Sequence, residues 1–167
     1  MDDPSLYNTD VVSWSQEQAV ALRRLADAAP GNAVDWANVI EEIESVGRSE
    51  WNGVRSQLTN ALDHLIRGVS DPNARSIEGW RAEIDAFLGD ARSDFRRSMA
   101  NQLDMEEIWQ RAMRWAKASL TRYDAAVAPD LPELCPFSLD EVLSPSFDFD
   151  AGYRRLKGHP HPTGDAA

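Results

Sequence analysis

The chain has 167 residues, of which 43% are hydrophobic and 27% are charged, as in a typical soluble globular protein. At this length a folded chain buries about 70% of the surface that its unfolded form exposes, so we expect one helical-bundle domain over residues 1–150 that needs no structural metal. Cys135 is the single cysteine, which excludes an intramolecular disulfide and a cysteine-based zinc site within one chain.

Acidic side chains dominate the charge of the chain, which is -11 at pH 7. Residues 1–50 carry 10 acids against 3 bases, whereas residues 51–127 carry 11 of each and residues 128–150 carry 6 acids and no base. A protein that binds DNA or RNA needs a basic face to displace counterions from the phosphates. We therefore expect no nucleic-acid partner.

The sequence lacks the patterns of a targeting segment or a membrane-spanning segment. Asp2 and Asp3 are acidic where a signal peptide is basic. No apolar run approaches the roughly 20 residues that span a bilayer. Since a single cysteine also fits a reducing compartment, we expect a cytoplasmic protein with no membrane partner.

Apolar residues recur every three or four positions along most of the chain, which predicts helices. Ser15 followed three residues later by Gln18 has the form of a capping box and predicts a first helix at about residues 15–28. The same spacing continues without slipping over residues 36–69. It predicts a second helix about 50 Å long that either bends near Gly47 or projects at one end. Two separate helices over this range stay open as the alternative.

The same periodicity predicts two further helices. One begins at Ile77 and continues toward Met99. The other begins after the capping residue Asp104 and ends before Pro129. The side chains of this last helix that we expect to point inward are Ile108, Trp109, Ala112, Trp115, Ala116, Leu120 and Tyr123.

The C-terminal part of the chain has a different character. Three prolines within residues 129–136 predict an extended segment that wraps over the helices, and Ser138 then begins a capping box for a one-turn helix that ends near Pro145. Residues 151–167 have no apolar pattern, and we expect them to be disordered. The predicted fold is all-α, an up-and-down bundle of four to five helices with a proline-rich C-terminal wrap and a short terminal helix.

The most distinctive string in the chain is Val39–Glu50, which reads Val-Ile-Glu-Glu-Ile-Glu-Ser-Val-Gly-Arg-Ser-Glu. Further marked segments are Leu6–Asp10 with Trp14, Gln18-Ala19 with Leu22-Arg23, His64–Arg67, Trp80-Arg81 and Cys135–Leu139. Together they resemble the uncharacterised DUF29 family over roughly residues 5–148. The resemblance implies a helical domain from a cyanobacterium or proteobacterium. It implies no established activity, so it carries over no catalytic residue.

Glu41, Glu42 and Glu44 are the strongest chemical feature of the second predicted helix. With about 100° per residue and Leu58 at the centre of the apolar stripe, Glu44 lies about 40° from that centre, whereas Glu42 points to solvent. We therefore expect Glu44 to be partly buried and to pair with Arg48, because an unpaired buried carboxylate is costly. The alternative partners are Arg55 and the indole N–H groups of Trp80 and Trp115. Two roles stay open for it: an anchor of an interhelical polar network, or a ligand-binding or general-base residue.

His64 is the one histidine that we expect within the folded part, because His159 and His161 fall in the predicted tail. A di-iron bundle places a glutamate three residues before such a histidine, but that position is Ala61 here. The adjacent Asp63 diverges from His64 by about 100°, so the two side chains do not readily bind one ion. We expect His64 to hydrogen-bond a backbone carbonyl or a carboxylate, and we assign no metal and no cofactor.

Six tryptophans are many for a chain of this length, and most lie on predicted apolar stripes, where core packing explains them. Trp36 and Trp51 differ, because their rings would form an exposed apolar patch if the second helix extended beyond its neighbours. Such a patch would suit self-association or a protein partner.

The sequence contains no glycine-rich phosphate loop, no nucleophile elbow and no His-Glu-x-x-His zinc motif. We therefore expect a noncatalytic helical module for protein interaction or self-association, with a homodimer or another protein as its partner. The alternative is a small-molecule binder or enzyme with a pocket lined by Glu44, Arg48, His64 and Trp80, beside which Glu41 is a further ligand-binding candidate. Catalytic residues are not assigned.

Overall fold

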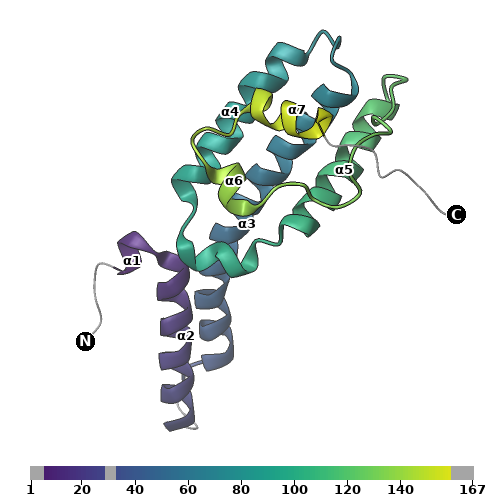
Figure 1. Ribbon diagram of the computed structural model, residues 1–167. Coiled ribbons are helices and arrows are strands. Elements are labelled where there is room, and N and C mark those ends of the chain that lie inside the picture. The colour runs from purple at the N-terminus through teal and green to yellow at the C-terminus, as the bar shows by residue number, and fades with distance from the viewer. Residues whose placement is uncertain (1–5, 29–32, 159–167) are drawn as a thin grey trace, which may run out of the picture. The chain divides into compact units, whose positions relative to one another are not determined.

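The computed structural model describes residues 6–28 and 33–158, and every regular element in this part of the chain is a helix (Figure 1). The all-α prediction is therefore confirmed. The elements in chain order are α1 (Leu6–Thr9), α2 (Val11–Ala28), α3 (Trp36–Ser70), α4 (Ile77–Asp94), the 3-10 helix η1 (Arg97–Gln102), α5 (Met105–Thr121), α6 (Leu139–Leu143) and α7 (Phe149–Lys157).

These helices belong to two compact units. Unit 1 comprises Met1–Val54 and Asp94–Gln102, and unit 2 comprises Arg55–Ser93 and Leu103–Ala167. Helix α3 is one uninterrupted helix rather than two, and it contributes its first part to unit 1 and its second part to unit 2. The single domain expected over residues 1–150 stays a prediction.

In unit 1, helix α2 packs antiparallel to the first part of α3 (Figure 1). The contact is closest where Ser15 lies opposite Gly47, because a Cβ atom at position 47 would overlap the Ser15 hydroxyl. That hydroxyl donates a hydrogen bond to the carbonyl of Val12 at 2.9 Å and is buried. Ser15 is therefore an interior residue of α2, and the prediction that it begins the helix was wrong.

The residue that begins α2 is Asp10. Its carboxylate accepts hydrogen bonds from the Ser13 backbone N–H at 3.0 Å and from the Ser98 hydroxyl of η1 at 2.7 Å. Partial burial raises the pKa of Asp10, but the hydrogen bonds from Ser13 and Ser98 and the nearby Arg96 guanidinium outweigh it and lower the pKa below 3.8. Asp10 thus caps α2 and ties its start to η1.

The core of unit 2 is formed by the second part of α3 together with α4, α5 and α7. Its largest fully buried side chains are Leu58, Leu62, Leu65, Ile66, Ile84, Leu88, Ile108, Trp109 and Leu156. The Trp109 indole N–H donates to the Pro132 carbonyl at 3.3 Å, and the Cys135 N–H donates to Glu106 at 2.8 Å. The proline-rich segment therefore lies against α5, in agreement with the predicted wrap.

Two predicted helix starts at the C-terminal side are confirmed. The Asp104 carboxylate accepts the N–H groups of Glu106 and Glu107 and begins α5. The Ser138 hydroxyl accepts the N–H of Glu141 at 3.2 Å and begins the short helix α6. Both caps satisfy N–H groups that have no partner within the first turn of a helix.

The prediction of disorder from residue 151 was wrong for residues 151–158. Asp148 accepts the N–H of Ala151 at 2.8 Å and begins α7, in which Phe149, Gly152 and Leu156 are buried. A stripe of three residues in nine is too short to stand out as a periodic pattern, and a glycine is one of the three. The rest of the predicted tail, with both of its histidines, lies outside the described residues.

Three other expectations about packing were also wrong. Met99 belongs to η1 rather than to α4, which ends at Asp94. Trp115 and Tyr123, expected to point inward, are 45% and 81% exposed. Of the six tryptophans, Trp109 alone is fully buried, so core packing accounts for fewer of these rings than the spacing predicted.

Candidate functional site

The predicted acidic block lies on the part of α3 that belongs to unit 1. Glu44 is half-buried and Glu42 is exposed, as the helical wheel predicted. The partner of Glu44 is Arg23 of α2, whereas Arg48 pairs with Glu41 two turns earlier on α3. The predicted pairing of Glu44 with Arg48 was therefore wrong, because α2 brings a second arginine to the side of α3 on which Glu44 lies.

A cavity of about 240 Å³ adjoins this ion pair within unit 1. It is lined by Val12, Ser15, Gln16, Glu44, Gly47, Arg48, Trp51 and Gln102. The carboxylates of Glu44 and Glu41 each have an arginine partner, so neither is left as an unpaired base. The remaining polar groups are two amides, an indole and the Ser15 hydroxyl, which suit hydrogen bonding to a small polar molecule more than acid–base chemistry.

His64 lies in unit 2, where both of its ring nitrogens contact oxygen atoms. Nδ1 is 2.8 Å from the Asn60 carbonyl and Nε2 is 2.7 Å from the Glu83 carboxylate. Since both oxygens only accept hydrogen bonds, the two contacts are satisfied together when the ring carries two protons. The prediction that His64 bonds a carbonyl or a carboxylate is confirmed, and it bonds both.

Around His64 the structure forms a polar cluster that also contains Trp80. The buried Asp63 carboxylate is 3.2 Å from the Arg67 guanidinium, which in turn lies 4.9 Å from the centre of the Trp80 ring. Burial raises the pKa of Asp63 above 3.8, although the charges of Arg67 and His64 act in the opposite direction. Every member of this cluster therefore has a neighbour within the fold.

Sequence reasoning missed the burial of Asp63, which is 7% exposed. On the predicted wheel this residue lies about 140° from Leu58, well outside a single apolar stripe. The second part of α3 is buried around most of its circumference, as a central helix is. The available signal was the run Ala61–Val69, which has five apolar residues and few charges.

The predicted site residues do not meet in one described cavity. Glu41, Glu44 and Arg48 belong to unit 1, whereas His64 and Trp80 belong to unit 2. The 240 Å³ cavity has Glu44 and Arg48 in its lining and none of the other three. Within the described ranges no group of three or more His, Cys, Asp or Glu side chains is arranged to hold a metal ion.

A second feature of unit 1 is an apolar surface that we call the hairpin face, formed by Leu22 and Leu25 of α2 and by Val39, Ile43 and Val46 of α3. Leu25, Val39 and Val46 are 56%, 39% and 37% exposed. Leu22 and Ile43 are half-buried. A contiguous exposed apolar patch often marks a surface that binds another molecule.

The helical wheel places all five residues on the same side of the hairpin. About α2, Arg23 lies about 100° to one side of Leu22 and Leu25 lies about 60° to the other. About α3, Glu44 lies about 100° to one side of Ile43, whereas Val39 and Val46 lie about 40° to 60° to the other. Since the Arg23–Glu44 pair marks one flank of the antiparallel helices, the apolar residues share the opposite flank.

None of the helices in the described part of the chain is long and apolar enough to cross a membrane. A model of the family described as "Domain of unknown function DUF29" matches residues 6–148. The chain is also similar to an α-helical protein of unknown function from Rhodospirillum rubrum, known from a crystal structure, with 31% identity and a TM-score of 0.81. That likeness covers 90% of this chain and 96% of the other. No curated protein matches.

Proposed function

The chain belongs to the DUF29 family, and we propose that it is a noncatalytic self-association module in which the hairpin face of one copy packs against the hairpin face of a second copy. The single observation that carries this proposal is the exposure of Leu25, Val39 and Val46 on one flank of α2 and α3. As part of the same proposal, the module acts in the bacterial cytoplasm, the reducing compartment that its single cysteine fits.

The small core of unit 1 supports the proposal. Of the 18 residues of α2, only Val12, Ser15 and Ala19 are buried, whereas the 17-residue helix α5 buries five side chains. Most of the stability of a protein helix comes from packing its apolar face. Two hairpins that meet face to face would supply the four helices of a bundle and cover the apolar flank of each.

A second copy fits the hairpin face in both charge and symmetry. None of the five residues of the hairpin face is charged, so two chains of net charge -11 could meet there without opposing carboxylates at its centre. A twofold axis through the face would place the same patch on both copies. Each exposed leucine or valine that became fully buried would stabilise the dimer by up to about 1.5 to 3 kcal/mol.

The oligomeric state tests the proposal. We expect sedimentation velocity over a concentration series to detect a reversible dimer of the intact chain. Val46→Glu should weaken dimerisation at least about tenfold, because it buries a carboxylate in an apolar interface. Val20→Glu is the matched control: Val20 is 45% exposed on α2 but lies about 160° from Leu22 on the wheel.

Two results would contradict self-association through this face. One is a strict monomer at every concentration. The other is an equal effect of Val46→Glu and Val20→Glu on the dimer, which would place the interface elsewhere. Both variants change exposed residues, and far-ultraviolet circular dichroism checks that each remains helical.

The alternative of a ligand-binding or catalytic pocket has weaker support. Its cavity of about 240 Å³ is smaller than the roughly 300 to 1,000 Å³ of usual ligand pockets. Both glutamates at this site, Glu41 and Glu44, form ion pairs with arginines. Both pairs oppose a general-base role, and the Arg23–Glu44 pair between α2 and α3 favours an interhelical polar network.

A further inference from the structure

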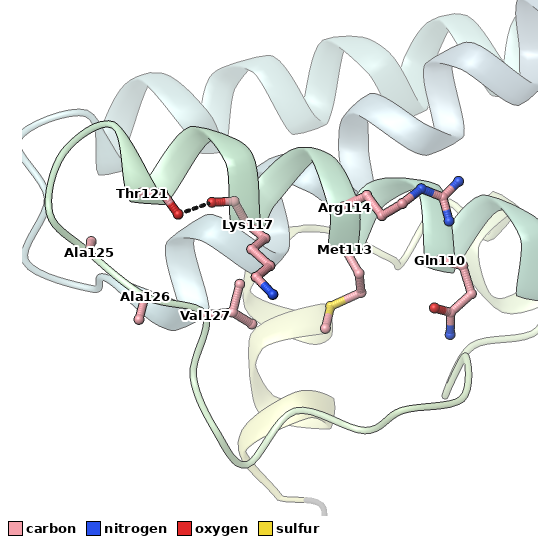
Figure 2. A pocket seen from close by; sticks show the side chains of 8 residues that line it. All are labelled: Gln110, Met113, Arg114, Lys117, Thr121, Ala125, Ala126 and Val127. Atoms are coloured by element: carbon pink, nitrogen blue, oxygen red, sulfur yellow. Dashed lines mark hydrogen bonds between the residues drawn. The ribbon is translucent and has the colours of Figure 1, made fainter.

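Unit 2 has a larger hollow, of about 450 Å³, between one face of α5 and the segment that follows this helix (Figure 2). Its lining consists of Gln110, Met113, Arg114, Lys117, Thr121, Ala125, Ala126 and Val127. The α5 residues in this list recur every three or four positions and so share one side of the helix. Figure 2 shows Lys117 and Met113 directed from the helix toward Val127 on the opposite wall.

Hydrogen bonds hold the far wall of the hollow in place. The Ala128 N–H donates to the Ser70 hydroxyl at 3.0 Å, and the Gln110 amide donates to the Glu133 carbonyl at 2.6 Å. Where the chain leaves α5, Asp124 has a φ of 57° and the Ala125 N–H donates to the Leu120 carbonyl at 3.1 Å. The segment is therefore fixed at the turn, at its middle and near its end, and the hollow is part of the fold of unit 2.

The charges around this hollow differ from those of the chain as a whole. Arg111 on the same helix pairs with Glu107 at 2.8 Å, but neither Lys117 nor Arg114 forms an ion pair with any described residue. The protein has a net charge of -11, and these two cations line the same hollow. Their positive charge is available to an anion from outside.

The other lining groups restrict the kind of anion. The Thr121 hydroxyl already donates to the Lys117 carbonyl at 2.8 Å, and the Gln110 amide is engaged with Glu106 and Glu133. Met113, Val127 and the two alanines provide an apolar wall. A phosphate dianion is normally held by several converging donors, whereas one ammonium beside an apolar wall suits a single carboxylate on an aliphatic body.

We propose that this hollow binds an aliphatic monocarboxylate, with its carboxylate paired to Lys117 and its chain packed on Met113 and Val127. Arg114, which lies along α5 at the margin in Figure 2, adds positive charge at the entrance. The site belongs to unit 2 and is independent of the proposed dimer through the hairpin face.

The lysine content of the protein provides a direct test. Lys117 and Lys157 are its two lysines, and reductive methylation with a carbon-13 label gives each a separate nuclear magnetic resonance signal while it keeps the charge. We expect decanoate, kept below its micelle concentration, to shift the Lys117 signal in a saturable way. The Lys157 signal should stay in place, because that side chain is on α7 and 3.8 Å from Asp130.

Matched variants and ligands separate this site from weak general binding. Lys117→Gln should lower the affinity for decanoate at least tenfold, whereas Lys157→Gln should leave it unchanged. Met113→Glu should lower it as well, since it places a carboxylate beside Lys117. Decanol, which has the same chain without the charge, and inorganic phosphate, which has the charge without the chain, should each bind at least tenfold more weakly than decanoate.

Three results would overturn the proposal. They are a decanoate effect that moves both lysine signals alike, an affinity that Lys117→Gln leaves unchanged, and a phosphate affinity equal to that of decanoate. The first two would mean nonspecific contact with the protein surface, and the third would assign the hollow to inorganic anions. Lys117 is exposed, so its replacement leaves the fold intact, which circular dichroism verifies.

Discussion

At the scale of single residues, the adjacent residues Asp63 and His64 of α3 differ in how their polar atoms are hydrogen-bonded. His64 directs both ring nitrogens at oxygen acceptors, whereas the Oδ1 atom of buried Asp63 has no hydrogen-bond partner. Burial raises the pKa of Asp63, and the nearby Arg67 and His64 do not fully offset it. The charged form of Asp63 is thus less favourable in the folded protein than in the unfolded chain.

This shift predicts how stability changes with pH. Because the pKa of Asp63 is higher in the folded protein than in the unfolded chain, this carboxyl contributes its full stabilisation below pH 3.8. That stabilisation is lost as the pH rises through the pKa of Asp63 in the folded protein. Asp63→Asn removes that loss. The free energy of unfolding of the variant, measured relative to the natural protein by urea titration, should therefore rise between pH 3.8 and neutrality.

Asp10→Asn is the control with the opposite sign. Its lowered pKa contributes stability that is present above pH 3.8 and lost as the pH falls below that value, and asparagine keeps the capping ability. The loss in free energy of unfolding that Asp10→Asn causes relative to the natural protein should therefore become smaller as the pH falls. If the two variants followed the natural protein in parallel at every pH, the assigned environments of both carboxyls would be wrong.

At the scale of elements, the contact between α2 and α3 depends on the absence of a side chain at Gly47. In an open helix position, replacing glycine by alanine stabilises a helix by about 0.8 to 1 kcal/mol. At position 47 the new methyl group would overlap the Ser15 hydroxyl. Overpacking of this kind typically costs about 1 to 3 kcal/mol.

We expect Gly47→Ala to leave the protein at least about 1 kcal/mol less stable than Gly53→Ala, as measured by chemical unfolding. Gly53 lies on the same helix, and a Cβ atom there would meet nothing within 4 Å. Adding Ser15→Ala to Gly47→Ala should recover most of the difference. Equal stabilities of the two alanine variants would show that the helices are not in close contact at this point.

At the scale of the whole molecule, the two units differ in how much apolar surface they bury. The buried apolar side chains lie mainly in unit 2, and the second part of α3 supplies Leu58, Leu62, Leu65 and Ile66 among them. In the first part of α3, valines at 39 and 46 are exposed. One helix therefore passes from a weakly buried environment to a strongly buried one.

This difference predicts unequal hydrogen exchange along α3. In dilute protein the backbone amides of residues 58–69 should exchange at least about tenfold more slowly than those of residues 38–50, because local opening depends on buried contacts. Raising the protein concentration should slow exchange in residues 38–50 and in α2 if the hairpin faces pair. Uniform protection along α3 in dilute protein would contradict the assigned difference in burial.

The candidate site was predicted less well than the fold. The wheel about Leu58 correctly predicted the half-burial of Glu44 and the exposure of Glu42, because the first part of α3 is buried on one side only. It failed for Asp63, because several elements surround the second part of α3. The partner of Glu44 was also missed, since no spacing within α3 indicates the arginine on α2.

The amino-acid sequence by itself determined the helical class of this protein, the helical character of residues 36–69 and the caps at Asp104 and Ser138, whereas the structure decided that residues 36–70 form one helix rather than two. These features depend on periodicity and on side chains within a few residues of one another. Only the tertiary structure decided which flank of the α2–α3 hairpin stays apolar and exposed, and which lysine lies beside a hollow. Those properties depend on contacts between distant parts of the chain, which local spacing does not encode.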